Sequence, residues 1–246
     1  MNLSNGGPPP STEFLLDPGW SDASRLFLEN MILQNRGAIA AFDFDDTLLD
    51  GDLSLTLLNH RDPSGAALKD YERGCQEDVA RAYAQLVETL IVGRRETDIR
   101  AEVLELFSHS LSTGALRLRP ALIELIWAMQ RNSWVVYIVT ASPAVVISPV
   151  AQQLGIPADH VLGMWCNTDP KDRFCPPTQA PITYREGKVS AIQTAIQSKE
   201  LTFAAGDAIT DLELLEYASN QLVVDKGVAA LRIVAEEKGW LIERDL

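Results

Sequence analysis

Cysteine is scarce in this chain, and long hydrophobic runs are missing. Its three cysteines, Cys75, Cys166 and Cys175, form neither a CxxC pair nor a metal-binding spacing. So sparse and odd a count is typical of a reducing compartment, and we expect idle thiols, with a Cys166–Cys175 disulfide as the alternative. No run approaches the roughly 18–20 apolar residues of a membrane span, and residues 1–10 lack the basic and apolar regions of a signal peptide. We therefore expect a soluble, cytoplasmic protein with no membrane partner.

Basic residues are also few. The chain has 21 Lys and Arg against 34 Asp and Glu, a formal net charge of −13. This charge argues against nucleic acid or an anionic membrane surface as a partner, and leaves a small anion bound locally through a metal ion. With 246 residues, 46% of them hydrophobic, the chain can bury a sizeable core as one large domain or as a domain with an insertion.

The most informative stretch that is present is an apolar run ending in three acids, Ala38-Ile-Ala-Ala-Phe-Asp-Phe-Asp-Asp-Thr-Leu48. It predicts a buried strand over residues 38–44, with Asp43, Asp45 and Asp46 crowded at its carboxyl end. In an open parallel sheet that end binds ligands, and crowded carboxylates favour a bound cation. The alternative is a solvated acidic turn that caps the next element.

Strands and helices alternate along most of the chain. Apolar runs predict strands over residues 38–44, 134–139, 161–164, 201–205 and 222–224. Start signals predict helices that begin near residues 21, 120, 143, 187, 211 and 228. The first of these carries four apolar residues at helical spacing, Leu26, Phe27, Met31 and Ile32. The alternation predicts an α/β fold with a Rossmann-like parallel sheet and right-handed crossovers.

Residues 51–118 break the alternation and show no convincing strand. Helix formers fill residues 66–91, and residues 96–111 have the apolar periodicity of another helix. We expect a helical cap over residues 51–118, a core of residues 21–50 and 119–246, and a flexible tail of residues 1–20. The proline-rich residues 165–185 predict a long loop or a β-hairpin.

Three predicted strands and one predicted helix start carry polar side chains suited to one site, namely Asp43 with Asp45, Thr140, Asp207 with Asp211, and Lys188. The carboxyl ends of parallel strands meet at one edge of a sheet, so we expect these side chains to converge. Singly, Thr140 is an ordinary strand-end residue, Lys188 an ordinary surface lysine and Asp211 a helix cap. Together they offer a nucleophile, an acid/base, metal ligands, a hydroxyl and an ammonium.

This set resembles the haloacid dehalogenase-like superfamily of phosphatases. The resemblance covers residues 38–224 and lies in Asp43-Phe-Asp-Asp-Thr47, Ile138-Val-Thr140, Lys188 and Gly206-Asp-Ala-Ile-Thr-Asp211. The helical insertion resembles the C1 cap of that family. The Val-Thr-Ala-Ser-Pro and Arg-Glu-Gly-Lys-Val stretches resemble its phosphoserine-phosphatase-like branch, which includes phosphocholine and phosphoethanolamine phosphatases. Asp46 departs from the pattern, because many members have Gly or Ser there; we expect its side chain to point away from the phosphate.

The resemblance implies a role for each core residue. Asp43 attacks phosphorus and becomes an aspartyl phosphate. Asp45 protonates the leaving oxygen and then takes a proton from water. Thr140 and Lys188 bind phosphate oxygens and offset charge in the transition state. Ala141, next to Thr140, is a further candidate for substrate binding.

The resemblance also implies Mg²⁺ as cofactor. Asp43, the backbone carbonyl of Asp45 and Asp207 are the implied ligands, with waters completing an octahedron. Asp211 is implied to hold a metal-bound water or to position Lys188. The metal site is therefore expected at Asp43, Asp45, Asp207 and Asp211.

Substrate choice is expected to lie in the cap, which closes over the site. Asp52 stands nine positions after Asp43, about where the resemblance places an acid that meets a substrate's amino group; equally, Asp52 can cap the following helix. A substrate carboxylate would need an arginine, for which the candidates are Arg73, Arg81, Arg94 and Arg95. We assign Arg81, in the longest predicted cap helix, with a solvated helix face as the alternative.

A quaternary ammonium would need an aromatic cage, for which the candidates are Tyr71, Tyr83, Trp165 and Phe174. Ordinary packing is the alternative for these four. The three histidines converge in no recognisable spacing and receive no role.

The sequence thus predicts a Mg²⁺-dependent phosphatase acting on a small phosphorylated metabolite of the phosphoserine, phosphocholine or phosphoethanolamine kind. A phosphotransferase that uses an alcohol acceptor, or a non-catalytic binding protein on the same fold, are the alternatives. The intact acid/base carboxyl argues against the latter. For the oligomeric state, both a monomer and a homodimer stay open.

Overall fold

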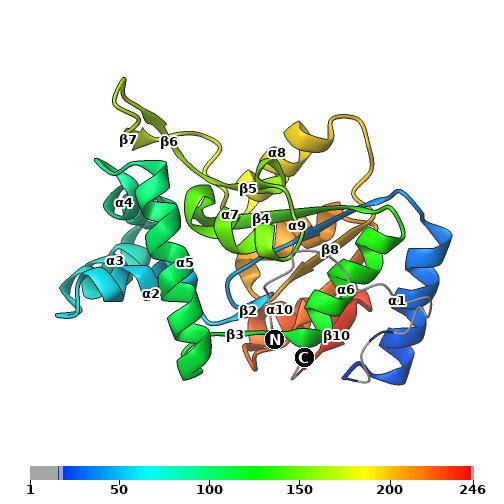
Figure 1. The fold of residues 1–246 in the computed structure, drawn as a ribbon. Helices are drawn as coiled ribbons and strands as arrows, with labels where there is room; N and C mark the ends of the chain where they lie inside the picture. Colours follow the sequence, from blue (N-terminus) through cyan, green and yellow to red (C-terminus); the bar gives the residue numbers. More distant parts are fainter. Residues whose placement is uncertain (1–15, 17–18, 245–246) are drawn as a thin grey trace.

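A six-stranded parallel sheet forms the centre of the computed structural model, which describes Leu16 and residues 19–244. The strand order is β10-β9-β8-β1-β4-β5 (Figure 1). In that order the strands are Leu241–Glu243, Asn220–Val224, Phe203–Gly206, Ile39–Phe42, Val135–Pro143 and Val161–Met164. The predicted parallel α/β sheet is confirmed. Only β10 was missed, because its apolar run, Trp240-Leu-Ile242, has just three residues and lies at the end of the last predicted helix.

Helices cover both faces of the sheet. Ala40 and Phe42 of β1 pack with α1, α6 and α7, whereas Ile39 and Ala41 pack on the other side with α8, α9 and α10. This alternation is the period of two that a strand imposes, and burial on both faces explains why β1 is apolar at every position. The six helices are Asp22–Gln34, Pro120–Arg131, Ala144–Gln153, Glu186–Ile196, Leu212–Tyr217 and Ala229–Lys238.

The N-terminal region differs from its prediction in two respects. The side chain of Ser21 caps α1, which begins close to the predicted residue 21, but α1 buries Leu28, Met31 and Ile32 and leaves Leu26 and Phe27 exposed. The apolar face predicted for α1 was therefore partly wrong, because the face that is buried includes Leu28 and excludes Leu26 and Phe27. Leu16 and Trp20, within the predicted flexible tail of residues 1–20, are buried in the core. The rest of that tail, apart from Gly19, lies outside the described residues.

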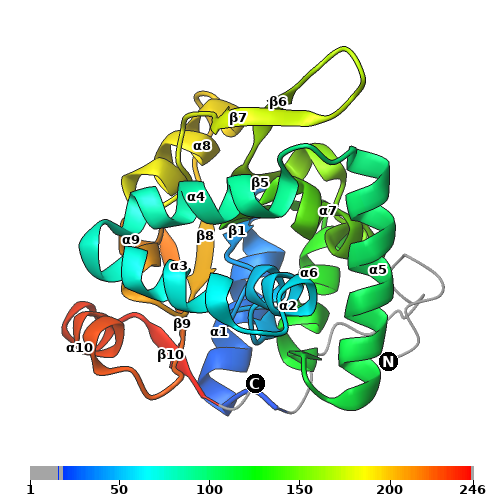
Figure 2. The same ribbon diagram turned by 90° about the vertical axis from the view of Figure 1, so that its left-hand side faces the viewer.

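Four helices form the insertion predicted for residues 51–118. The pair of short antiparallel strands β2 (Leu49–Asp50) and β3 (Arg117–Leu118) connects it to the sheet. Its helices are α2 (Leu53–Arg61), α3 (Ala66–Glu77), α4 (Val79–Ile91) and α5 (Glu96–Thr113), shown facing the viewer in Figure 2. We call α2–α5 the helical insertion. Its apolar residues join the core cluster on the α1, α6 and α7 side of the sheet.

Three expectations about the insertion were wrong. Residues 66–91 form two helices, because the Asp78 side chain accepts from the Arg81 backbone N–H and starts α4. The longest helix is consequently α5 rather than the one that carries Arg81. β3 is a strand where none was expected, although it has only two residues.

Residues 165–185 contain a β-hairpin, which resolves the two alternatives for that segment. Its strands are β6 (Cys166–Thr168) and β7 (Phe174–Thr178), and the hairpin lies above α4 in both ribbon views. Backbone hydrogen bonds attach it to the insertion: Gly93 N donates to Phe174 O at 2.8 Å, and Phe174 N to Arg94 O at 3.0 Å. The hairpin therefore packs on the helical insertion although in the chain it follows β5, the edge strand of the sheet.

The cysteines and the helix lengths bear on two further expectations. Cys75, Cys166 and Cys175 are free thiols, so the alternative of a Cys166–Cys175 disulfide is wrong. Among the residues that the structure describes, each helix is too short or too polar to cross a bilayer.

Candidate active site

The loop after β1 carries the predicted nucleophile and acid/base. Asp43 N donates to Ala205 O of β8 at 2.9 Å, which extends the pairing of the two strands by one residue. Two backbone N–H groups, of Leu48 and Leu49, then converge on Phe44 O and close the loop tightly. Asp43 is buried and Asp45 half-buried, so both carboxyls are held at the carboxyl edge of the sheet.

Lys188 is the buried cation of this edge. Its side chain is 2% exposed, and its Nζ lies 2.6 Å from Asp43 Oδ1 and 2.5 Å from Asp211 Oδ1. Burial alone lowers the pKa of a lysine, but the Asp211 and Asp43 carboxylates more than offset it, and the pKa of Lys188 is raised. Lys188 therefore stays charged, and the alternative of an ordinary surface lysine is wrong.

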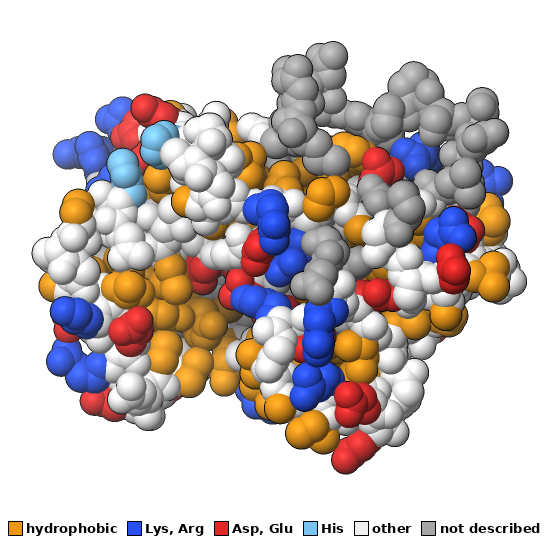
Figure 3. Space-filling view, turned by 90° about the horizontal axis from the view of Figure 1, so that it is seen from below, with side chains coloured by type: hydrophobic (Ala, Val, Ile, Leu, Met, Phe, Trp, Pro, Cys, Tyr) orange, Lys and Arg blue, Asp and Glu red, His pale blue; other side chains and the backbone are white. Residues whose placement is uncertain are grey.

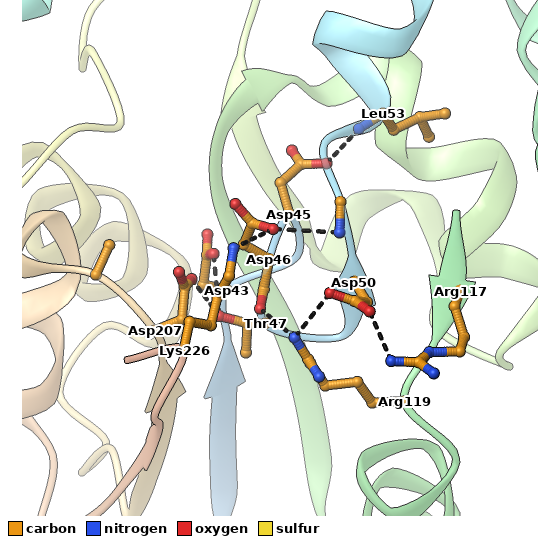
Figure 4. Close-up of polar contacts among 12 residues, drawn as sticks. Asp43, Asp45, Asp46, Thr47, Asp50, Leu53, Arg117, Arg119, Asp207 and Lys226 are labelled. Carbon is orange, nitrogen blue, oxygen red and sulfur yellow. Dashed lines mark hydrogen bonds and ion pairs between the residues drawn. The ribbon is translucent and has the colours of Figure 1, made fainter. Parts of the chain in front are cut away.

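Asp207 and Asp211 reach the same point from the turn after β8. Thr47 Oγ1 lies 2.9 Å from Asp207 Oδ1 and 3.2 Å from Asp43 Oδ2 (Figure 4). Asp211 Oδ2 accepts from the backbone N–H groups of Asp207 and Ala208 at 3.2 and 3.1 Å. A Cβ on Gly206 would lie 2.6 Å from the Asp211 Cβ, so only glycine lets this turn fold back so closely.

Three carboxyls thus lie close together, and this crowding raises the pKa values of two of them. Oxygens of Asp43, Asp207 and Asp211 lie within 4.8 Å of one another. Burial, together with the neighbouring Asp211 and Asp45, raises the pKa of Asp43 to about 7 despite Lys188. Burial and the neighbouring Asp43 raise the pKa of Asp207 to about 8. One ammonium therefore leaves the cluster under-neutralised, and its all-oxygen donor set fits a hard divalent cation such as Mg²⁺.

Asp45 is held between the insertion and the sheet. Its Oδ1 accepts from Leu53 N, in the first turn of α2, at 2.8 Å, and its Oδ2 accepts from Ser142 Oγ at 2.6 Å. Ser54 Oγ in turn donates to Ser142 Oγ at 2.8 Å. Burial, and next the nearby Asp52 carboxylate, raise the pKa of Asp45. A carboxyl of raised pKa can hold a proton near neutral pH, as a general acid requires.

Ser142 and Ser54 were missed from the sequence. The only available signal was that Ser142 lies two positions beyond Thr140 in the same strand, so that both face the same side. Thr140 is buried; its Oγ1 accepts from Ser142 N at 3.0 Å, and its carbonyl accepts from Thr183 Oγ1 at 2.6 Å. Ala141, which lies between Thr140 and Ser142 in β4, is half-buried.

Asp46 departs from the resemblance and has a position of its own. Its φ of 62° lies in the left-handed region, which aspartate tolerates better than most residues. Its carboxylate accepts from Gly51 N at 3.2 Å and pairs with Lys226 (Figure 4). The contacts of the Asp46 carboxylate are therefore with Gly51 and Lys226, while Asp43 makes its own with Lys188 and Thr47.

Asp52 caps α2, as one of its two predicted roles requires. Its Oδ1 accepts from Leu55 N at 2.7 Å, and burial raises the pKa of Asp52 to about 6. Asp52 still influences the site while it caps α2, because its carboxylate is the charged neighbour that raises the pKa of Asp45 most.

The arginine candidates of the insertion have other surroundings. Arg81 is exposed on α4. Arg73 pairs with Asp70 on an exposed part of α3, and Arg94, in the loop before α5, pairs with Glu102. Binding of substrate by Arg81 therefore stays a prediction without a supporting contact among the described residues.

The aromatic candidates divide into two groups. The rings of Tyr71 and Tyr83 lie 6.0 Å apart, and Tyr83 lies 5.7 Å from Tyr184, which the sequence did not single out. Tyr184 is four residues before Lys188, so this contact joins the insertion to the segment that carries the buried lysine. Phe174 is buried in the hairpin and Trp165 is exposed.

Comparison with known proteins places this geometry in context. The sequence model of the haloacid dehalogenase-like hydrolases matches residues 40–216. No curated protein sequence matches the chain.

Solved structures share the fold at low sequence identity. A conserved protein of unknown function from Anaerococcus prevotii DSM 20548 aligns with a TM-score of 0.70 and 14% identity, over 94% of this chain and 93% of that one. A phosphoserine phosphohydrolase-like protein from Francisella tularensis gives 0.59 and 20%, over 85% and 95%. A phosphoserine phosphatase described as a phospho-aspartyl intermediate analogue gives 0.58 and 14%, over 86% and 96%.

Proposed function

The chain belongs to the haloacid dehalogenase-like hydrolases, and on that premise we propose that it is a Mg²⁺-dependent phosphatase of small phosphomonoesters that works through an aspartyl phosphate. One observation carries the proposal. Asp43 is paired with a fully buried lysine, while Asp45, two residues later, is held separately by Leu53 N and Ser142 Oγ. A nucleophile paired with a buried cation, beside a separately held acid of raised pKa, is the arrangement that phosphoryl transfer with an alkoxide leaving group needs.

The metal site would be formed by the crowded carboxylates. Asp43, Asp207 and the backbone carbonyl of Asp45 would hold Mg²⁺, with Asp211 beside them. When bound, the ion would neutralise charge on the cluster and on the phosphoryl oxygens. The raised pKa values of Asp43 and Asp207 support this, because they express the cost of packing carboxylates together without such a charge.

The first half-reaction transfers the phosphoryl group to the protein. An Asp43 carboxylate oxygen forms a bond to phosphorus as the bond to the leaving oxygen breaks, and Asp45 gives its proton to that oxygen. Lys188 offsets charge on the phosphoryl oxygens, and the Thr140 hydroxyl, whose oxygen already accepts from Ser142 N, has its proton free to donate to one of them.

The second half-reaction returns the protein to its starting state. Asp45, now a carboxylate, takes a proton from water as the water oxygen attacks phosphorus. The bond between phosphorus and Asp43 breaks, and inorganic phosphate is the product. Ser142 and Leu53 N keep Asp45 in one place through both steps, which lets a single carboxyl act as acid and then as base.

Recognition of the leaving group is assigned to Asp52, Arg81 and Ala141. Asp52 keeps one carboxylate oxygen for a substrate ammonium while the other caps α2. We therefore favour amine-bearing phosphomonoesters, such as phosphoethanolamine, phosphocholine and phosphoserine. Arg81 is the proposed partner for a carboxylate-bearing member of that set.

The test is a screen of phosphorylated metabolites, with Mg²⁺ and with excess EDTA, scored by release of inorganic phosphate. The Asp45→Asn variant sharpens it, because a nitrophenolate leaves without a proton whereas an alkoxide does not. We expect that variant to lose about a hundredfold or more in rate of phosphoenzyme formation with an alkyl phosphate, and far less with nitrophenyl phosphate. Full activity after exhaustive chelation, or equal losses on the two substrates, would contradict the proposal. Transfer to an added alcohol in place of phosphate release would favour the phosphotransferase alternative.

A further inference from the structure

A hollow apart from the cluster of Asp43, Asp207 and Asp211 lies where the helical insertion joins the sheet. It has a volume of about 780 Å³ and is lined by four cations, Arg117, Arg119, Lys226 and Arg244, against two carboxylates, Asp50 and Asp225. In the whole chain acids outnumber bases by 34 to 21, so this excess of cations runs opposite to the overall charge. Figure 3 shows basic side chains gathered at the centre of this face. We call it the basic hollow.

The two carboxylates are each shared between arginines. Asp50 receives Arg117 at 2.8 Å and Arg119 at 3.3 Å, through different oxygens. Asp225 pairs with Arg244 and also lies 3.7 Å from Arg232. A guanidinium has five N–H donors, so the one Asp50 carboxylate, divided between Arg117 and Arg119, satisfies neither the charge nor the donors of these two in full. Lys226 pairs with Asp46, so the positive charge that the acids do not cancel lies at Arg117 and Arg119.

Arg119 is the buried member of the set. Its side chain is 7% exposed, and its Nε–H, also buried, has no hydrogen-bond partner within the described residues. Its remaining contacts, to Asp50 Oδ1 and Asp46 O, are long at 3.3 and 3.4 Å (Figure 4). An unpartnered buried donor on a charged group costs free energy, which a ligand of opposite charge would recover.

The start of α6 adds backbone donors at the same place. Arg119 is the N-cap residue but makes no side-chain cap, and Pro120 occupies the first turn. Pro120 and Ala121 line the basic hollow, so the helix presents its uncapped, positive end there. Such an end binds phosphate groups when cations accompany it.

From these four observations we propose that the basic hollow binds a phosphate or diphosphate group, as a site separate from the one at Asp43. The charge, the buried Arg119 and the helix start all favour a multivalent oxyanion over a carboxylate. Arg117 and Arg119, which share one carboxylate in the hollow, suit the bidentate pairing that phosphate oxygens offer. The site does not depend on the proposed phosphatase activity, since it includes neither the nucleophile nor the acid/base.

The probe is inorganic pyrophosphate, titrated calorimetrically into the metal-free protein in excess EDTA. Under these conditions the uncompensated carboxylates around Asp43 repel an anion. We expect one saturable site that weakens with rising salt. Arg119→Gln should weaken binding about tenfold or more, and Arg117→Gln about threefold or more. Because Arg117 is 71% exposed, its variant tests the site even if the Arg119 variant fails to fold.

Two controls locate the binding. Arg73→Gln removes a comparably exposed arginine on α3 and should leave the affinity for pyrophosphate unchanged. Lys188→Ala removes the cation beside Asp43 and should also leave it unchanged. Absence of saturable binding, or a site that is lost with Lys188→Ala and kept in Arg117→Gln, would overturn the proposal.

Discussion

Removing one acid from the crowded cluster should stabilise the metal-free protein. Asp207 shares its surroundings with Asp43 and Asp211, and its burial beside Asp43 raises its pKa to about 8. An acid whose pKa is higher in the folded than in the unfolded protein resists ionisation in the fold. The folded state then binds more protons, so its stability falls as pH rises from the unfolded pKa to the folded one. Asp207→Asn should remove that penalty, because an amide carries no charge and can still accept from Thr47.

The magnitude follows from the same two values. Each tenfold difference in proton affinity corresponds to about 1.36 kcal/mol. Because the pKa rises from 3.8 to about 8, the penalty grows between these values and is at most about 4 kcal/mol at about pH 7. We expect about 1–2 kcal/mol, since Asp207 is half-buried and shares its proton with Asp43. In a protein of this size that is a rise in Tm of roughly 2–8 °C.

The assay is thermal unfolding in excess EDTA at about pH 8 and about pH 4.5, where most of the penalty is absent. The gain in Tm should appear at the higher pH and nearly vanish at the lower. Asp70→Asn, at an exposed position on α3, is the matched control and should behave as the wild type. Adding Mg²⁺ should stabilise the wild type and not Asp207→Asn. A variant less stable than the wild type at about pH 8 would refute the reasoning.

Three further outcomes are expected. Asp52→Ala should lower kcat/KM by about ten- to hundredfold on an amine-bearing phosphomonoester and hardly at all on an uncharged aryl phosphate; an equal loss on both would mean that Asp52 supports only the fold. Glu102→Gln should cost about 1–2 kcal/mol in urea unfolding at about pH 7, because Arg61 binds both its oxygens, at 2.8 and 2.6 Å. Since those bonds lower the pKa of Glu102 below its ordinary value of 4.5, the difference should shrink as pH falls through that lowered value, and a constant difference would contradict the assignment. Asp43→Asn should abolish turnover without unfolding the protein, because an amide cannot form the aspartyl phosphate. Residual activity within tenfold of the wild type would contradict the assignment of Asp43 as the nucleophile.

The sheet edge could be predicted from sequence because each signal was local. An apolar run followed abruptly by Asp43, or by Thr140, marks both a strand and the residue at its carboxyl end. Parallel pairing of β1 with β4 and β8 then puts those ends side by side, without further information. Lys188 was predicted to reach this edge and, from the resemblance, to bind phosphate oxygens, but its pairing with Asp43 was not predicted, since nothing in the sequence around a single lysine indicates its burial.

What could not be predicted depends on contacts between distant segments. Ser142 contacts Asp45 across 97 positions of the chain, and neither residue reveals the other. The attachment of the hairpin to Gly93 and Arg94 is made by backbone groups, which carry no sequence signal. The break before α4 was in principle visible, because Asp78 among helix formers is a typical cap residue.

The central claim is that Asp43 carries the phosphoryl group during turnover. The most direct measurement is to quench the reaction with acid during steady-state hydrolysis of nitrophenyl phosphate, whose leaving group needs no proton, and to analyse the peptide that contains Asp43 by mass spectrometry. We predict one phosphoryl group on Asp43, removed by hydroxylamine, more abundant in Asp45→Asn because its second step lacks a base, and absent in Asp43→Asn. Steady phosphate release with no acyl phosphate on Asp43 in either the wild type or Asp45→Asn would contradict the account.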